Sequence, residues 1–136
     1  MKAMFLALFL TLSFLHSHES DSYTDYEKLH EYSSYITLGL IGATILSTEN
    51  RGIHETFGTL AGVSMIGTSA LGVYAHSDDV FDLSDGWQKI HWHSLISTIA
   101  SVAMIATLVE APEDSHQTLG MIGGISAVVS FVIVKW

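Results

Sequence analysis

Four long apolar blocks dominate this sequence and limit what it can fold into. They lack lysine, arginine and proline, and their only charged residues are Glu31 and Glu55; they cover residues 29–48, 53–75, 94–109 and 118–134. Each block is close to the roughly 20 residues that a helix needs to cross the hydrocarbon core of a bilayer. Hydrophobic residues make up 49% of the chain and charged residues only 14%, which leaves too little polar surface for a water-soluble fold. The sequence therefore predicts an integral membrane protein.

The charge and the absence of cysteine exclude several classes of function. The 136-residue chain has a net charge of −9 at pH 7, whereas a nucleic-acid-binding protein needs a basic surface. It has no cysteine, which excludes disulfides, iron–sulfur clusters, thiolate zinc sites and covalently attached haem. Nucleic acid is therefore not an expected partner.

The first residues form a separate segment. Lys2 precedes an apolar run over residues 3–15, which is short for a membrane span but suits a secretory signal. We expect a signal peptide over residues 1–18, with an uncleaved N-terminal anchor as the alternative, followed by an acidic tether over residues 19–28. A cleaved leader would place the N-terminus outside, and we expect the membrane to be the bacterial inner (cytoplasmic) membrane.

The segments between the apolar blocks are short and predict antiparallel helices. Gly52 and Pro112 interrupt two of these segments, and short turns make successive helices neighbours. In a bilayer only helices or closed barrels satisfy every backbone polar group, and these blocks are too long for barrel strands. The expected fold is all-α, a four-helix up-down membrane bundle over residues 29–136 built from two tandem helical hairpins.

An internal repeat relates the two hairpins. Residues 54–64 (HETFGTLAGVS) match residues 116–126 (HQTLGMIGGIS) at five of eleven positions, with an offset of 62 residues. The first and third blocks align at almost the same offset, with His30 opposite His93. Because both copies run in the same direction, the pseudo-twofold axis should lie along the membrane normal.

Four histidines occupy equivalent places in this repeat, each at the start of an apolar block. In an up-down bundle, His30 and His93 fall at one membrane face, and His54 and His116 fall at the other. Two equivalent imidazoles across an axis suit a planar macrocycle with two axial positions. We expect haem b, two copies or at least one, with each histidine pair providing the two axial ligands of one iron.

Small residues lie beneath each histidine on the same helix face. The positions seven residues on are Thr37, Ala61, Ala100 and Gly123, and the positions four residues on are Ser34, Gly58, Ser97 and Gly120. Their short side chains would leave slots for a flat porphyrin, and we expect the second set to contribute to cofactor binding. The alternative is close helix packing, which small residues also favour in membranes.

Two further histidines are candidate substitute ligands. His91 lies two residues before His93, so only one of them can face the bundle axis, and the repeat favours His93. His76 falls on the same helix face as His54, beside an acidic loop. Three interpretations of it stay open: a loop residue, a substitute ligand and a proton-transfer group. No catalytic residue is predicted.

With one histidine in each of four consecutive helices, the chain resembles the cytochrome b-561 family of membrane electron carriers. The resemblance lies in this topology and in the segments 29–31 (LHE), 53–58 (IHETFG) and 115–120 (SHQTLG), and it extends over residues 29–134. It implies two b haems held between the first and third and between the second and fourth helices. The implied function is transmembrane electron transfer, by an electron-transfer protein or an oxidoreductase subunit. The haem A synthase family also duplicates a four-helix histidine bundle, in longer chains.

Two other classes of function stay open. A haem-free metal-binding or metal-transport protein would use histidines and acidic residues to hold zinc or copper. A cofactor-free helical subunit of a larger membrane complex would use the small-residue stripes to receive partner helices. For an electron carrier, the expected partners are membrane lipid and either a quinol or a redox partner protein, with homo-oligomerisation or incorporation into a redox complex both open.

Overall fold

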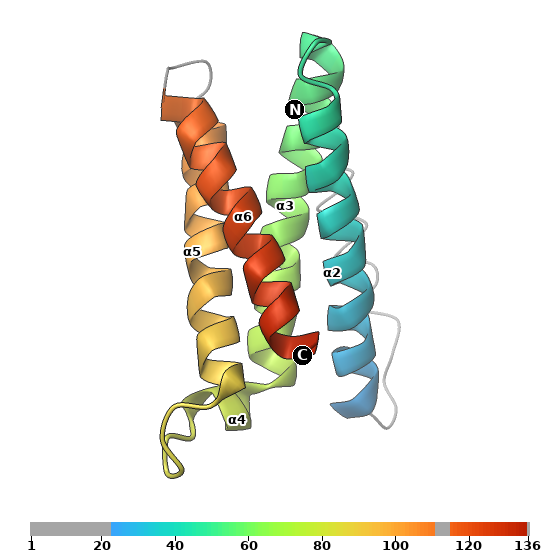
Figure 1. The fold of residues 1–136 in the computed structure, drawn as a ribbon. Coiled ribbons are helices and arrows are strands. Elements are labelled where there is room, and N and C mark those ends of the chain that lie inside the picture. Colours follow the sequence, from blue (N-terminus) through green and yellow to red (C-terminus); the bar gives the residue numbers. More distant parts are fainter. Residues whose placement is uncertain (1–22, 111–114, 136) are drawn as a thin grey trace.

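The computed structural model describes residues 23–110 and 115–135, and within these ranges helices are the only regular secondary structure. Its elements are α2 (Tyr23–Leu46), α3 (Arg51–Ala75), α4 (Ser77–Phe81), α5 (Lys89–Glu110) and α6 (Ser115–Lys135) (Figure 1). The predicted signal peptide or anchor lies outside the described residues. So does the first part of the predicted tether.

Two boundaries differ from the sequence prediction. Helix α2 begins at Tyr23, ahead of the predicted start at residue 29, so the second part of the predicted tether is helical. The acidic loop after α3 contains the short helix α4, which was not predicted because five residues are too few to show a helical period. Both differences lie at polar ends, where sequence patterns define helix limits least well.

The turn between α2 and α3 is fixed by a side-chain cap. The Asn50 side chain accepts a hydrogen bond from the backbone N–H of Ile53 at 3.2 Å, so α3 begins immediately after Asn50. Such a cap satisfies one of the donors that the first helical turn leaves unpaired. The turn is therefore tight, and it brings α3 back alongside α2.

The four long helices pack in a cyclic order. Helices α2 and α3 pack along one another, as do α5 and α6; α3 packs against α5, and a small contact joins α2 to α6 (Figure 1). Among the described elements, α2 does not pack against α5, and α3 does not pack against α6. These two pairs of helices therefore lie diagonally across the centre of the molecule.

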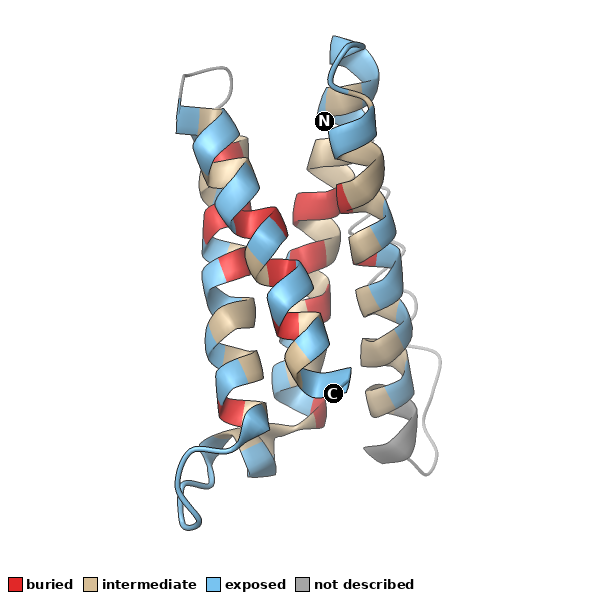
Figure 2. Ribbon diagram, viewed as in Figure 1, coloured by how far each residue is buried: buried red, intermediate tan, exposed pale blue. Residues whose placement is uncertain are grey.

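The buried centre of the molecule is made mainly of small residues. Ala61 and Ala100 are fully buried, and they pack with two methionines, one isoleucine and one further alanine: Met65, Met104, Ile41 and Ala127. Figure 2 shows the buried positions on facing sides of the helices. Small side chains allow the backbones to approach closely, as membrane helices do.

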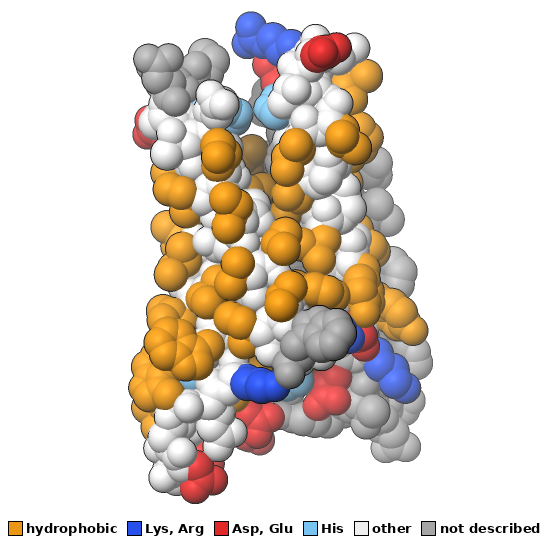
Figure 3. All heavy atoms as spheres, in the orientation of Figure 1, with side chains coloured by type: hydrophobic (Ala, Val, Ile, Leu, Met, Phe, Trp, Pro, Cys, Tyr) orange, Lys and Arg blue, Asp and Glu red, His pale blue; other side chains and the backbone are white. Residues whose placement is uncertain are grey.

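Large apolar side chains lie mostly on the outside. Figure 3 shows hydrophobic side chains covering the length of the helices and charged side chains gathered at the two ends. Three helices, α3, α5 and α6, are long and apolar enough to cross a membrane. Helix α2 is equally long but does not reach that apolar content, because its first half carries charged residues, serines and tyrosines. The prediction of four spans is thus supported for three.

Candidate cofactor site between facing histidines

The structure brings the predicted histidines together in two pairs. The ring centres of His30 and His93 are 6.0 Å apart with an angle of 76° between the planes, and those of His54 and His116 are 6.0 Å apart with an angle of 71°. The first pair joins α2 to α5 and the second joins α3 to α6, so each pair spans one diagonal of the helix arrangement. The pairs lie at opposite ends of the helices, as the sequence predicts.

Each of the four rings is held by a backbone carbonyl of the other helix in its hairpin. Nδ1 lies 2.9 Å from the carbonyl oxygen in all four cases; the contacts are His30 to Thr68, His54 to Thr44, His93 to Ser130 and His116 to Thr107. The first and third contacts correspond in the repeat, and so do the second and fourth. The duplication therefore extends to the bonds that orient the rings.

These bonds fix the position of the hydrogen on each ring. A carbonyl oxygen accepts only, so Nδ1 must donate, and in the neutral ring Nε2 then carries a lone pair. No described residue forms a hydrogen bond with Nε2 of His30, His54, His93 or His116. The described part of the chain also contains no fully buried side-chain nitrogen without a partner, so each Nε2 borders open space. Metal-binding histidines have this arrangement, one nitrogen held by an acceptor and the other free to coordinate.

The spacing within each pair fits one metal ion. A first-row metal binds an imidazole nitrogen at about 2.0–2.1 Å, and the nitrogen lies about 1.15 Å from the ring centre, so two opposed rings have centres about 6.4 Å apart. Both pairs measure 6.0 Å. Two neutral nitrogen ligands on opposite sides leave the equatorial positions for a macrocycle, so the donor set fits haem iron.

A pocket lies between His30 and His93. It is lined by residues of all four long helices, and six of them carry hydroxyl groups: Ser34, Thr37, Thr68, Ser69, Ser97 and Ser130. The pocket has a volume of about 40 Å³ and is partly open to the outside. A porphyrin is much larger than this volume, so its binding at this site would require the lining side chains and helices to move apart.

The hydroxyl groups of this pocket bond to one another. Thr37 Oγ1 lies 2.7 Å from Ser64 Oγ and 3.0 Å from Thr68 Oγ1, and Ser97 Oγ lies 2.6 Å from Ser130 Oγ. Ser130 Oγ also lies 2.9 Å from Nδ1 of His93. These bonds fix the residues whose carbonyls hold His30 and His93, so the rings are oriented by a supported backbone.

The four small residues predicted to contribute to cofactor binding divide into two kinds. Ser34 and Ser97 line the pocket between His30 and His93. At Gly58, by contrast, an added Cβ would lie 3.4 Å from Thr44 Cγ2, and at Gly120 it would lie 3.5 Å from Thr107 Cγ2. Both distances are ordinary van der Waals contacts, so a threonine of the neighbouring helix in the hairpin already borders each of these positions. Gly58 and Gly120 therefore lie at the contact between the two helices of each hairpin, where close packing is the alternative to a slot.

Sequence reasoning missed the residues that hold the rings. All four acceptor carbonyls belong to serine or threonine, but a backbone acceptor leaves no signal in a single sequence. Gly72 was also missed: an added Cβ would lie 2.7 Å from Cε1 of His30, so the ring occupies space that only glycine leaves. The repeat does not predict this glycine, because Val134 occupies the corresponding position in the second hairpin.

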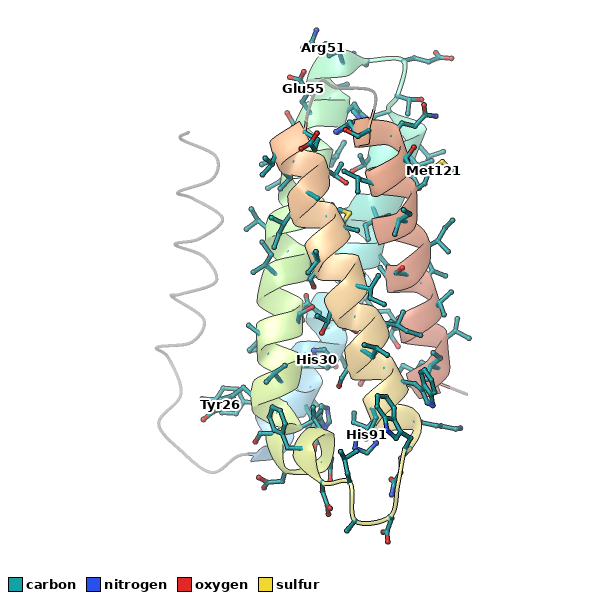
Figure 4. All side chains as sticks on the ribbon, turned by 90° about the vertical axis from the view of Figure 1, so that its left-hand side faces the viewer. Tyr26, His30, Arg51, Glu55, His91 and Met121 are labelled. Atoms are coloured by element: carbon teal, nitrogen blue, oxygen red, sulfur yellow. The ribbon has the colours of Figure 1, made fainter. Side chains whose placement is uncertain are left out.

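His91 has the opposite tautomer and a structural role. Its Nδ1 accepts a hydrogen bond from the backbone N–H of Gln88 at 2.9 Å, so Nε2 carries the hydrogen and donates to the carbonyl of Asp82, also at 2.9 Å. The side chain is buried, and Figure 4 shows it at the loop end of α5. Both nitrogens are engaged by the loop, so His91 has no nitrogen left for a metal in this conformation.

His76 lies beside the first pair. Its ring centre is 5.9 Å from that of His30, and its Nδ1 is 4.0 Å from Oδ2 of Asp79 in α4. No group of three or more histidine, aspartate or glutamate side chains with metal-binding geometry occurs in residues 23–110 and 115–135. The metal-binding alternative, which needs histidines and acidic residues around one ion, therefore finds no such group in the described part of the chain.

The chain was compared with protein-family models, with curated proteins and with solved structures, and none of them matches it.

Proposed function

We propose that this protein is a membrane electron carrier similar to cytochrome b-561, with two b haems held by two pairs of histidines in a transmembrane four-helix bundle. His30 and His93 would be the axial ligands of one iron, and His54 and His116 those of the other. The observation that carries this proposal is the arrangement of the four rings. Two pairs have the same 6.0 Å spacing, and every ring donates from Nδ1 to a carbonyl.

The two ligand pairs define the chemistry that such a site supports. A bis-histidine haem supplies reversible one-electron transfer, and with both axial positions filled it has no open site for O₂. The backbone acceptors would hold the rings in a fixed orientation, which would limit rearrangement between oxidation states. The hydroxyl network around His93 adds a second support to that ring. We therefore propose an electron-transfer protein or oxidoreductase subunit rather than a stand-alone enzyme.

The positions of the two histidine pairs give the proposed path of electron transfer across the membrane. One pair lies at each end of the helices, so electrons would pass between the two membrane faces. A signal peptide over residues 1–18 would place the His30 end outside the bacterial inner membrane. A quinol or a redox partner protein would exchange electrons with the carrier; we leave the choice to experiment.

Spectroscopy on membranes that contain the expressed protein tests this proposal. We expect a dithionite-reducible, low-spin b-type spectrum and haem that acid acetone extracts. Replacing His54 or His116 with alanine should abolish one centre, and replacing His30 or His93 should abolish the other. His91→Ala serves as a control, because its nitrogens bond to the loop, and it should keep both centres.

Three outcomes would contradict the proposal. Zinc or copper in the purified protein without a pyridine haemochrome would favour a metal-binding protein. Absence of any metal would favour a cofactor-free subunit. Loss of the same centre from variants of both pairs would contradict the assignment of one centre to each end.

A further inference from the structure

A cross-hairpin ion pair closes one side of the first histidine pair. Lys135, at the end of α6, bonds through Nζ to Oε1 of Glu31 on α2. Tyr35 donates a hydrogen bond to the same carboxylate oxygen at 3.2 Å, and Nζ lies 5.6 Å from the Tyr35 ring centre. Because α2 belongs to the first hairpin and α6 to the second, this ion pair joins the two hairpins.

This lysine lies on α6 just beyond the residues that line the pocket. Ser130 and Phe131 of α6 line the pocket between His30 and His93, and Lys135 follows one helical turn later, with Nζ 6.0 Å from the Phe131 ring centre. Its partner Glu31 is the residue after His30. The Lys135 side chain is about one-third exposed, so it is open to water beside this ion pair.

The diagonal placement of the ligands decides which helices a macrocycle would face. His30 lies on α2 and His93 on α5, and these two helices do not pack against each other. A planar ligand held between the two rings would be perpendicular to the line from His30 to His93. Two of its edges would therefore face α3 and α6, the helices of the other diagonal. At this end of the molecule, α6 ends with Lys135.

We propose that Lys135 binds a carboxylate of the haem held by His30 and His93, an inference that rests on the proposed function. Haem b carries two propionate groups, which need cations or water, and an ammonium group has three donors. Lys135 therefore holds Glu31 with one donor and a propionate oxygen with another. The ion pair keeps the lysine just beyond the residues that line the pocket, where the propionate would arrive.

The other end of the molecule has no equivalent cation in the described residues. Arg51 pairs with Glu55 within α3 at 2.7 Å, and both side chains are largely exposed. Figure 4 shows the two at the far end from His30. The effect of Lys135 is therefore specific to one of the two centres.

The test compares haem with haem dimethyl ester, in which both carboxylates are blocked. Release of each from the full-length protein in detergent is followed by transfer to apomyoglobin, in the wild type and in the Lys135→Gln and Lys135→Arg variants. We expect Lys135→Gln to release haem from one centre about 3- to 10-fold faster, since a partly exposed ion pair is worth little more. Lys135→Arg should resemble the wild type, and the ester should leave wild type and Lys135→Gln at equal rates. Lys28→Gln removes an exposed lysine from α2 and is the matched control, with no expected effect.

Two results would overturn this inference without touching the proposed function. Equal acceleration of haem and ester in Lys135→Gln would mean that the lysine only braces the hairpins. Unchanged release of both would mean that it contributes nothing to retention. A wild-type protein that takes up no haem would refute the proposed function itself, and the inference with it.

Discussion

His30 is held by α3 through two backbone features. The carbonyl of Thr68 accepts its Nδ1 hydrogen, and the bare backbone of Gly72 makes room for Cε1. The Thr68 carbonyl sets the direction of the ring, and the space at Gly72 sets how closely the ring approaches α3. A substitution at Gly72 therefore tests the ligand position without removing the ligand.

We predict that Gly72→Ala removes the His30/His93 centre and leaves the other centre intact. The new Cβ would lie 2.7 Å from Cε1 of His30, and a side-chain ring gives way more easily than a helix backbone. The ring should therefore turn away while the helices remain folded. Difference spectra and haem quantification measure the result. Gly42→Ala, whose added Cβ meets nothing within 4 Å, is the control; retention of both centres in Gly72→Ala would show that the ring does not need this position.

The sequence predicts the histidine pairs better than the groups that hold their rings. The histidine pairs follow from one residue per helix, the repeat and the short turns, and each of these is visible in the chain itself. The acceptors at Thr44, Thr68, Thr107 and Ser130 are backbone groups, whose partners depend on helix spacing and rotation. The roles of Gly58 and Gly120 also depend on helix spacing, which decides whether a missing side chain leaves a slot or admits a neighbouring helix.

At the scale of the helices, the hairpins are set by close glycine contacts. An added Cβ at Gly62 would lie 2.6 Å from Cδ1 of Leu108. This contact between α3 and α5 joins the two hairpins. At Gly123 an added Cβ would lie 2.9 Å from the Met104 side chain and 3.3 Å from the Met104 backbone nitrogen. This contact joins α6 to α5. The second contact involves backbone, so a rotamer change alone does not relieve it.

We predict that Gly123→Ala destabilises the protein by about 1–3 kcal/mol, the usual cost of overpacking a tight core. The added methyl group would push α6 away from α5, and His116 would be drawn from the Thr107 carbonyl. Thermal unfolding in detergent, followed by far-ultraviolet circular dichroism, measures the change. Gly39→Ala adds the same methyl group to α2 in open space and should be neutral or stabilising. Equal melting temperatures for the two variants would contradict close packing at Gly123.

The helix boundaries were predicted in part. The apolar blocks predict the positions of α3, α5 and α6 because an apolar run of that length has few other structures available in a bilayer. They do not predict the start of α2, where the helix continues into polar residues without a change of pattern. They also miss α4, a five-residue helix that lies in the acidic loop and contacts α3 and α5.

At the scale of the whole molecule, the distribution of side chains is that of a membrane protein. The centre holds alanines, glycines and two methionines, while large apolar residues such as Val102 and Val109 are 61% and 75% exposed. In water such a surface would drive aggregation, because it far exceeds an ordinary apolar patch. In a bilayer the lipid tails cover it at no cost, and close packing of small residues holds the helices together.

We predict that Val102→Lys strongly reduces membrane integration, whereas Val109→Lys does not. Val102 lies near the middle of α5, and a lysine at the centre of a spanning helix costs about 2.5–3.5 kcal/mol, roughly a hundredfold in the insertion equilibrium. Val109 lies next to the end of the helix at Glu110, where a lysine side chain extends to the interface. The fraction of protein that resists carbonate extraction from membranes measures the difference, with total expression as the reference. Equal integration of the two variants would mean that this face of α5 meets water or another protein rather than lipid, and α5 would no longer count as a lipid-exposed span.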